Sequence, residues 1–267
     1  MILGMGPALL FCPADRPERF AGALQKADAV ILDLEDAVLP DAKAEARENV
    51  IAADLDPSRV IVRVNAPETA EFALDVEALQ RTPFRTVMVA KSEDPSAFDA
   101  FGADFGVIAL CETARGVHRA GEIASHGRTV GMMWGAEDLV ASLGGLSSRF
   151  PDGRYRDVAR AARAQVLLAA GAYGRTAVDA VHLDIDDVDG LAAEAADAVA
   201  SGFGATACIH PKQVAVIRDA YRPDGATLSW ARAVLAAAEG ERGVFRHDGR
   251  MIDEPVLRHA RAVLSRG

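Results

Sequence analysis

Eight short apolar runs, separated by segments of helical pattern, constrain the fold of this 267-residue chain more than any other feature. A short apolar run between Gly, Pro or polar residues is typical of a buried parallel strand. We expect strands at residues 8–13, 29–36, 59–65, 86–91, 107–112, 129–134, 178–184 and 205–211. Because strands and helical segments alternate, the pattern predicts parallel β/α units, and the strand count favours a closed (β/α)8 TIM barrel over an open sheet.

Helical patterns fill the intervals between these runs and continue beyond the last one. Within the barrel region we expect helices at 17–26, 43–53, 74–80, 157–173, 190–200 and 212–221, and a long loop at 143–155. Further on, the sequence predicts a helix at 228–240, a hairpin-like flap around Asp248-Gly249 and a final helix at 256–264. We therefore predict a barrel over residues 1–222 and a C-terminal helical extension over 223–267, serving as lid and oligomer contact, in a single domain overall.

Charge and composition exclude several functional classes. The formal net charge of −10 argues against a nucleic-acid or anionic-membrane partner. Cys12, Cys111 and Cys208 are scattered without a CxxC motif, so we expect reduced core residues rather than disulfides or zinc ligands. We also expect neither a signal peptide nor a membrane span, which together predict a cytoplasmic protein.

Two of the predicted strands are followed by carboxylates that are candidate metal ligands. Glu112 ends the run at 107–112, and Asp138 follows the run at 129–134 after Gly135-Ala136-Glu137. In α/β folds, ligands bind at the carboxyl ends of parallel strands. Two carboxylates with little His or Cys nearby suit a hard cation such as Mg²⁺. An alternative stays open from spacing alone: both acids pair with Arg115 or cap the helices that follow.

Other polar residues at predicted strand ends suggest how a small acid is bound. Arg63 suits capture of a carboxylate or stabilisation of an oxyanion, with an ion pair to Glu35 or Asp36 as the plainer interpretation. The free N–H groups at Gly135-Ala136 are candidates for binding a substrate carboxylate. A Schiff base at Lys91 ranks below a salt-bridge or positioning role.

Histidines and the first arginines carry weaker signals. His182 and His210 lie in apolar runs, which favours core histidines over catalytic bases. Arg16 and Arg19 follow the first predicted strand and are candidates to meet a phosphate-bearing ligand, although a solvated helix start is the simpler interpretation.

Several motifs, in order along nearly the whole chain, resemble those of a known family. They are residues 10–20 (LFCPADRPERF), 31–38 (ILDLEDAV), 62–65 (VRVN), 110–114 (LCETA), 131–139 (GMMWGAEDL), 208–211 (CIHP) and 249–253 (GRMID). The set resembles the citrate lyase β-subunit-like proteins of the HpcH/HpaI aldolase/citrate lyase superfamily, in particular their stand-alone form.

The resemblance implies a (β/α)8 barrel that assembles as a homotrimer, with the C-terminal segment packed on a neighbouring subunit. It implies Mg²⁺, with Mn²⁺ as a substitute, held by Glu112 and Asp138, and Arg63 on the substrate. It places residues 135–138 (Gly135, Ala136, Glu137, Asp138) around the substrate acid and Asp253 as the acid/base carried by the lid. Glu35, Asp36 and Lys91 are candidates to support this site, and Arg16 is a candidate CoA contact.

The function expected from this resemblance is Mg²⁺-dependent carbon–carbon lyase chemistry. The enzyme would make or cleave 3-hydroxyacyl-CoA thioesters of the citramalyl-CoA, malyl-CoA, hydroxymethylglutaryl-CoA or citryl-CoA type, giving acetyl-CoA and a 2-keto acid. Two alternatives are kept: an aldolase acting on a free hydroxy-keto acid without a thioester, and a non-catalytic metabolite-binding protein. A requirement for the thioester would exclude the aldolase. Inactivity across a panel of acyl-CoA thioesters would favour the non-catalytic metabolite-binding protein.

Overall fold

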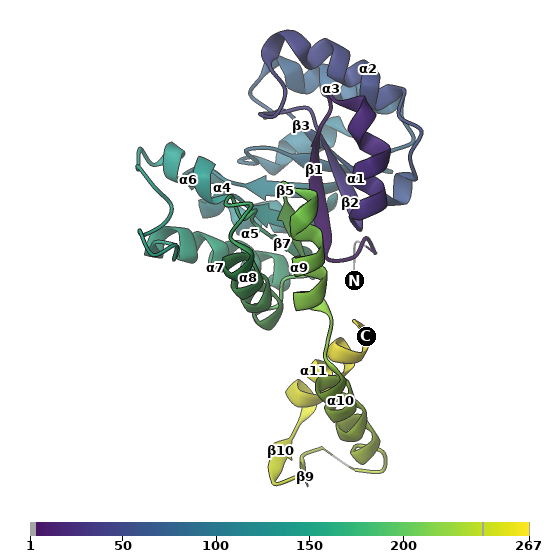
Figure 1. The fold of residues 1–267 in the computed structure, drawn as a ribbon, viewed down its shortest axis with the longest axis vertical. Helices are drawn as coiled ribbons and strands as arrows, with labels where there is room; N and C mark the ends of the chain where they lie inside the picture. Colours follow the sequence, from purple (N-terminus) through teal and green to yellow (C-terminus); the bar gives the residue numbers. More distant parts are fainter. Residues whose placement is uncertain (1–3, 242, 267) are drawn as a thin grey trace. The chain divides into compact units, whose positions relative to one another are not determined.

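The structure, a computed structural model, describes residues 4–241 and 243–266 of the chain. In this part of the chain, eight parallel strands close into a barrel in sequence order, and helices surround them (Figure 1). The strands are β1 (Ala8–Pro13), β2 (Ala29–Asp33), β3 (Val60–Val64), β4 (Thr86–Val89), β5 (Gly106–Cys111), β6 (Thr129–Trp134), β7 (Thr176–Asp179) and β8 (Ala205–Cys208). The predicted (β/α)8 TIM barrel is confirmed.

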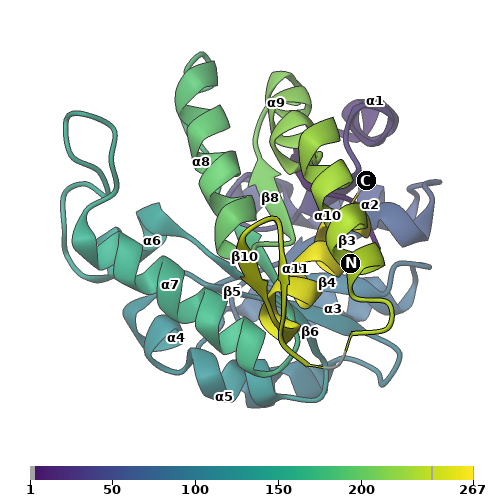
Figure 2. The ribbon, with the colours of Figure 1, turned by 90° about the horizontal axis from the view of Figure 1, so that it is seen from below.

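Helical segments connect successive strands, as the sequence predicts. The α-helices of this region are α1 (Phe20–Lys26), α2 (Lys43–Ile51), α3 (Ala70–Gln80), α4 (Ala114–His118), α5 (Ala120–Ser125), α6 (Ala136–Ser142), α7 (Asp157–Ala172), α8 (Val188–Ser201) and α9 (Pro211–Tyr221). Short 3-10 helices are η1 (Pro17–Arg19), η2 (Pro40–Ala42), η3 (Pro57–Arg59) and η4 (Pro95–Ala100). Each 3-10 helix has Pro in its first turn, where the missing N–H costs nothing. Figure 2 shows the helices of the barrel region around the strands.

Three strands end at least three residues earlier than predicted. Strand β2 ends at Asp33 rather than at residue 36, β7 ends at Asp179 rather than at 184, and β8 ends at Cys208 rather than at 211. Beyond Cys208, the N–H groups of Ile209 and His210 donate to the side-chain oxygen of Gln213 instead of to a neighbouring strand. The apolar residues Val181 and Leu183 follow β7 and line a cavity instead of pairing with a neighbouring strand.

The barrel interior is filled by apolar side chains that alternate along the strands. Ile31, Ile61, Met88 and Ile108, from four neighbouring strands, belong to one buried cluster. The register places Ile31 opposite Ile61 and Met88 opposite Ile108. This apolar layer fills the interior of the barrel. Polar side chains therefore gather at the carboxyl ends of the strands.

The residues after the barrel form a second compact unit. Contacts divide the chain into Met1–Ile217 and Arg218–Gly267. The second unit contains α10 (Gly225–Ala237), the antiparallel strands β9 (Phe245–His247) and β10 (Arg250–Ile252), and α11 (Glu254–Leu264). Figure 1 shows the two helices and the hairpin of this unit. The proposed domain boundary at residue 222 and the lid role of this unit stay predictions.

Local chemistry explains the elements of this second unit. Helix α10 begins three residues before the predicted start because the Asp224 side chain accepts a 2.6 Å hydrogen bond from the Thr227 N–H. The hairpin turns at Asp248 (φ 48°) and Gly249 (φ 77°), the positive pair that a tight two-residue hairpin requires. The two helices pack through a small buried cluster that includes Ala231, Val234 and Ala260. Across the described residues, no helix is long and apolar enough to cross a membrane.

Candidate active site

A cavity of about 350 Å³ opens at the carboxyl ends of the barrel strands. Its charged side is lined by Asp33, Arg63, Glu112, Glu137 and Asp138. Its apolar side is lined by Phe11, Leu110, Met133, Val181, Leu183 and Ile209. A concave apolar site with a few converging polar groups is the usual form of a small-molecule binding site.

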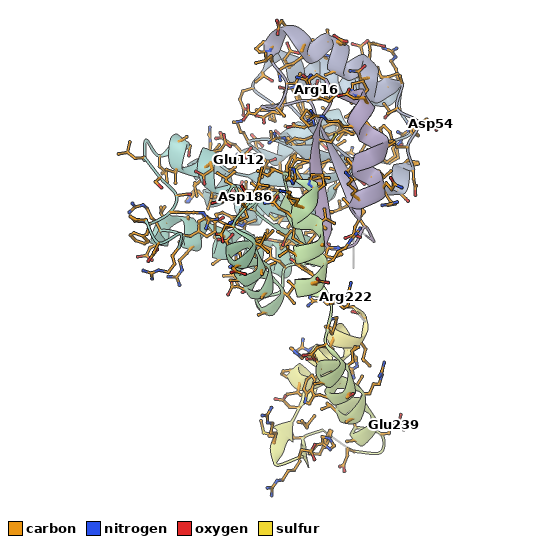
Figure 3. The ribbon with its side chains drawn as sticks, viewed as in Figure 1. Arg16, Asp54, Glu112, Asp186, Arg222 and Glu239 are labelled. Atoms are coloured by element: carbon orange, nitrogen blue, oxygen red, sulfur yellow. The ribbon has the colours of Figure 1, made fainter. Side chains whose placement is uncertain are left out.

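Glu112 is a buried carboxylate that lines this cavity. It follows Cys111, which pairs with Trp134 of β6, so Glu112 lies beside Gly135. Its side chain is almost fully buried, with 3% of the residue exposed, and its Oε1 accepts a 3.0 Å hydrogen bond from the main-chain N–H of Lys91. Burial and the neighbouring charge of Asp138 raise the pKa of Glu112 to about 8, against the opposing effects of Arg63 and Lys91. Figure 3 labels this residue among the side chains of the barrel unit.

Asp138 enters the same cavity from the first turn of α6. The Oδ1 atom of Asp138 lies 3.6 Å from Nζ of Lys91. Gly135 precedes this helix and also lines the cavity, together with Ala136 and Glu137. Asp138 thus shares the cavity with Glu112, and its negative charge adds to burial in raising the pKa of Glu112.

Arg63 supplies the positive charge of the cavity. Its Nε and Nη2 donate hydrogen bonds of 2.7 and 2.6 Å to the two oxygens of Asp33, and its Nη1 lies 3.2 Å from Oε2 of Glu35. The guanidinium also lies over the Phe11 ring, 4.9 Å from its centre. Although burial acts to lower it, the pKa of Arg63 is raised by Asp33 and then by Glu35 and Glu112, so the side chain stays charged. The expected ion pair with Glu35 is present.

Glu35, Asp36 and Lys91 form a connected group beside the cavity. The Lys91 ammonium contacts Oε1 of Glu35 and lies 3.2 Å from Oδ2 of Asp36. Lys91 also has a positive φ of 47°, which is unusual for a residue with a side chain. These ion pairs match the salt-bridge role that ranked above a Schiff base for Lys91.

The donor set fits a divalent cation with hard-ligand preference. Among the described residues at this end of the cavity, carboxylates outnumber the cations Arg63 and Lys91. The carboxylates are Asp33, Glu35, Asp36, Glu112 and Asp138. A cation beside Glu112 and Asp138 would relieve the repulsion that raises the Glu112 pKa. The described residues contain no group of three or more His, Cys, Asp or Glu arranged to hold a metal. A carboxylate pair with sites left for water and substrate suits Mg²⁺ rather than a closed structural zinc site.

Arg115 and His182 do not line the cavity and pair with other residues. Arg115 lies 3.9 Å from Glu93 and thus pairs away from Glu112. His182 is buried, with Nδ1 2.8 Å from Glu194 and Nε2 3.2 Å from Asp187, as expected of a structural histidine. The three cysteines are buried, as expected of core residues.

Like Glu35, Asp36 and Lys91, the predicted site residues Arg16 and Asp253 are outside the set that lines the described cavity. Arg16 has a 56% exposed side chain and lies 3.7 Å from Asp15 (Figure 3 labels it). Asp253 belongs to the second compact unit, where its Oδ1 accepts a 3.3 Å hydrogen bond from the Val256 N–H at the start of α11. The roles of both residues stay predictions.

The apolar side of the cavity is not predicted from the sequence. Val181 and Leu183 lie beyond the end of β7, and Ile209 lies beyond the end of β8. The sequence pattern predicts all three as strand residues that pair within the sheet. No local signal separates them from strand residues, because the predicted strands run to residues 184 and 211.

Comparisons with known proteins identify the family. The family model described as HpcH/HpaI aldolase/citrate lyase matches residues 8–211. A citrate lyase subunit beta-like protein of Mycobacterium tuberculosis is 58% identical over 261 residues, covering 98% of this chain and 95% of that protein. The chain belongs to the HpcH/HpaI aldolase/citrate lyase family.

Two further comparisons carry more specific descriptions. A (3S)-malyl-CoA thioesterase of Cereibacter sphaeroides is 35% identical, over 97% of this chain and 93% of that protein. The crystal structure of CitE from Mycobacterium tuberculosis, in complex with magnesium, acetoacetate and coenzyme A, superposes with a TM-score of 0.92. That structure is 57% identical and covers 99% of this chain and 98% of its own.

Proposed function

We propose that this member of the HpcH/HpaI family is a Mg²⁺-dependent carbon–carbon lyase that makes or cleaves 3-hydroxyacyl-CoA thioesters. One observation carries the proposal: Arg63, Glu112 and Asp138 line a single cavity at the carboxyl ends of the barrel strands. The proposal is also supported by the magnesium, acetoacetate and coenzyme A named for the CitE structure. The products in the cleavage direction would be acetyl-CoA and a 2-keto acid.

Glu112 and Asp138 would hold the metal. When bound, Mg²⁺ would supply a Lewis acid that polarises the oxygens of the keto-acid half of the substrate. The low exposure of Glu112 limits competition from bulk water at this point of the cavity. The main-chain N–H groups at Gly135, Ala136 and Glu137 would bind the substrate carboxylate.

Arg63 would stabilise the negative charge that develops when the carbon–carbon bond breaks. In that step the substrate hydroxyl loses its proton to a base, and the bonding electrons pass to the thioester carbonyl as an enolate. A charged donor that is already fixed by Asp33 and Glu35 needs little reorganisation when this charge forms. Arg63 would therefore stabilise the transition state more than the bound substrate.

Asp253 would protonate the enolate carbon and so complete acetyl-CoA, or deprotonate acetyl-CoA in the reverse direction. We propose that it acts from the C-terminal unit of a neighbouring subunit within a homotrimer. Arg16 would contact CoA, Mn²⁺ would substitute for Mg²⁺, and the cytoplasm would be the location. These finer assignments rest on the family resemblance and on the motif at residues 249–253.

The test is a product assay with a panel of 3-hydroxyacyl-CoA thioesters and purified protein, with Mg²⁺ and after its removal by a chelator. We expect acetyl-CoA and a 2-keto acid in equal amounts, only with the metal present. Release of free CoA with an intact hydroxy acid would instead indicate a thioesterase. Equal cleavage of the free hydroxy acid would indicate an aldolase, and no turnover of any substrate would refute lyase function.

A further inference from the structure

The buried carboxylate of Glu35 joins the two cations of the site. Its Oε2 lies 3.2 Å from Nη1 of Arg63, and its Oε1 contacts the ammonium of Lys91. Only 4% of the residue is exposed. Glu35 and Lys91 are not among the described residues that line the cavity. Both would therefore act through other residues.

The Lys91 ammonium lies between Glu35 and the metal carboxylate Asp138. It contacts Glu35 directly, whereas its distance to Oδ1 of Asp138 is 3.6 Å. Burial would lower the pKa of Lys91, but Glu35 more than offsets this and raises it, so the ammonium is fully charged. A charged ammonium beside Asp138 is a competitor for any cation that this carboxylate binds.

The main chain prevents Lys91 from moving away from this position. Its N–H donates a 3.0 Å hydrogen bond to Oε1 of Glu112, and the next residue, Ser92, donates a 2.9 Å hydrogen bond to the carbonyl of Leu110. The base of the Lys91 side chain is thus fixed at the cavity rim. Which carboxylate the ammonium contacts then depends on the flexible end of the side chain and on the charge of its partners.

Glu35 is held in place more firmly than its competitors for the ammonium. Its main-chain carbonyl accepts a 2.9 Å hydrogen bond from Lys43, and its N–H donates a 2.9 Å hydrogen bond to Oδ1 of Asp33. In contrast, the Asp36 and Asp138 side chains are 64% and 39% exposed, so water screens their attraction for the ammonium. The rigid, buried carboxylate is the better partner.

We propose that Glu35 is a positioning residue that holds the Lys91 ammonium off Asp138 and thereby keeps that carboxylate available to a divalent cation. The inference rests on the proposed function only in the use of Glu112 and Asp138 as metal ligands. It assigns Glu35 a role in setting metal affinity, separate from its ion pair with Arg63.

The test is a titration of the full-length protein with Mn²⁺ alone, with free Mn²⁺ measured by electron paramagnetic resonance. The variant Glu35→Gln keeps the shape of the side chain but removes the charge that holds the ammonium. Lys91 should then move toward Asp138, and Mn²⁺ should bind about tenfold more weakly, the lower end of the usual effect of residues that support metal ligands. Unchanged affinity in this variant would overturn the proposal.

A second substitution distinguishes positioning from general damage. In the double variant Glu35→Gln/Lys91→Met the competing ammonium is gone, so Mn²⁺ affinity should return to within about threefold of the wild-type value. If Glu35 had only a structural role, the double variant would bind as weakly as the single variant or more weakly, which would refute the proposal. Asp36→Asn is the matched control, because Asp36 contacts the same ammonium from an exposed position and should have a smaller effect.

Lys91→Met alone keeps the proposal testable if Glu35→Gln does not fold. Its Mn²⁺ affinity should equal or exceed that of the wild type, and a clear loss would contradict the competition argument. The lyase assay on the wild type is a separate test. If the variants show the expected Mn²⁺ affinities but the wild type cleaves no thioester, only the proposed function is refuted. A wild type that binds no Mn²⁺ would refute the proposed metal site and this inference together.

Discussion

Gly135 lies so close to Glu112 that a Cβ added to the glycine would be 2.8 Å from the Glu112 Cβ and 2.9 Å from its Oε2. The φ and ψ of Gly135, −127° and 127°, are open to any residue, so the glycine is required by space rather than by backbone conformation. Strands β5 and β6 pair up to Cys111 and Trp134, which brings these two positions side by side. Glu112 can lie beside the first turn of α6 only because no side chain is present there.

Gly135→Ala should therefore displace the Glu112 carboxylate. We expect metal affinity to fall about 10- to 100-fold and stability to fall by about 1–3 kcal/mol, since a buried contact is overpacked. Mn²⁺ titration and chemical denaturation measure the two effects. Gly121→Ala is the control, because an added Cβ there meets nothing within 4 Å and should be tolerated. Wild-type metal affinity in Gly135→Ala would contradict the assignment of Glu112 as a ligand.

Metal binding should depend on pH through Glu112. In the metal-free protein, burial and Asp138 raise the pKa of this carboxyl to about 8, so below that pH a proton must leave before the cation binds. Affinity should rise by up to about tenfold per pH unit between about pH 6 and about pH 8, and then level off. Calorimetry in buffers of different ionisation enthalpy should detect the released proton. Proton-free binding at neutral pH would argue against this role of Glu112.

Arg63→Lys should separate catalysis from folding. A lysine keeps a positive charge near the buried Asp33 and Glu35, but it cannot reproduce the paired hydrogen bonds to Asp33. We expect kcat to fall by about 10²–10³, because a fixed donor to the developing charge is lost, with a smaller change in Mn²⁺ affinity. Steady-state kinetics with a responsive thioester provides the measurement. Unchanged kcat would show that Arg63 has no transition-state role.

Asp253→Asn should test the acid/base role without removing a helix cap. The Asp253 side chain accepts a hydrogen bond from the Val256 N–H, so an alanine would also weaken α11 by about 0.5–2 kcal/mol. Asparagine preserves the cap but cannot exchange a proton. We expect turnover to fall about 10²–10⁴-fold while Mn²⁺ and keto-acid binding stay close to wild type. Turnover near the wild-type value would place the acid/base elsewhere.

His182 should make stability depend on pH. The hydrogen bond to Glu194 raises the pKa of His182 above its usual value, against the effect of burial, so the folded protein binds this proton more tightly than the unfolded chain. The stabilising contribution is complete below about pH 6.5 and is lost as the pH rises through the folded-state pKa. Urea denaturation of wild type and His182→Gln should show a difference that shrinks with rising pH. A difference that grew in alkali would reverse the assigned protonation.

The sequence predicted the barrel and much of the polar set, because both depend on local pattern. Alternating apolar runs and helices require parallel β/α units, and such units place the residues that follow each strand at one end of the barrel. Arg63, Glu112 and Asp138 are candidates because they lie at or after predicted strand ends, and the structure brings them to one cavity. Their chemical roles stay predictions to be tested as described above.

Only the tertiary structure decided which charges meet and which apolar residues face a ligand. The contacts of Glu35 with Arg63 and Lys91 join β2, β3 and the end of β4, and nothing in the local sequence specifies the side-chain geometry that connects them. Val181 and Ile209 have the composition of strand residues, yet they lie beyond the last paired positions of β7 and β8. Composition reports that a side chain prefers to leave water, whereas strand register and packing decide whether it meets the core or a bound molecule.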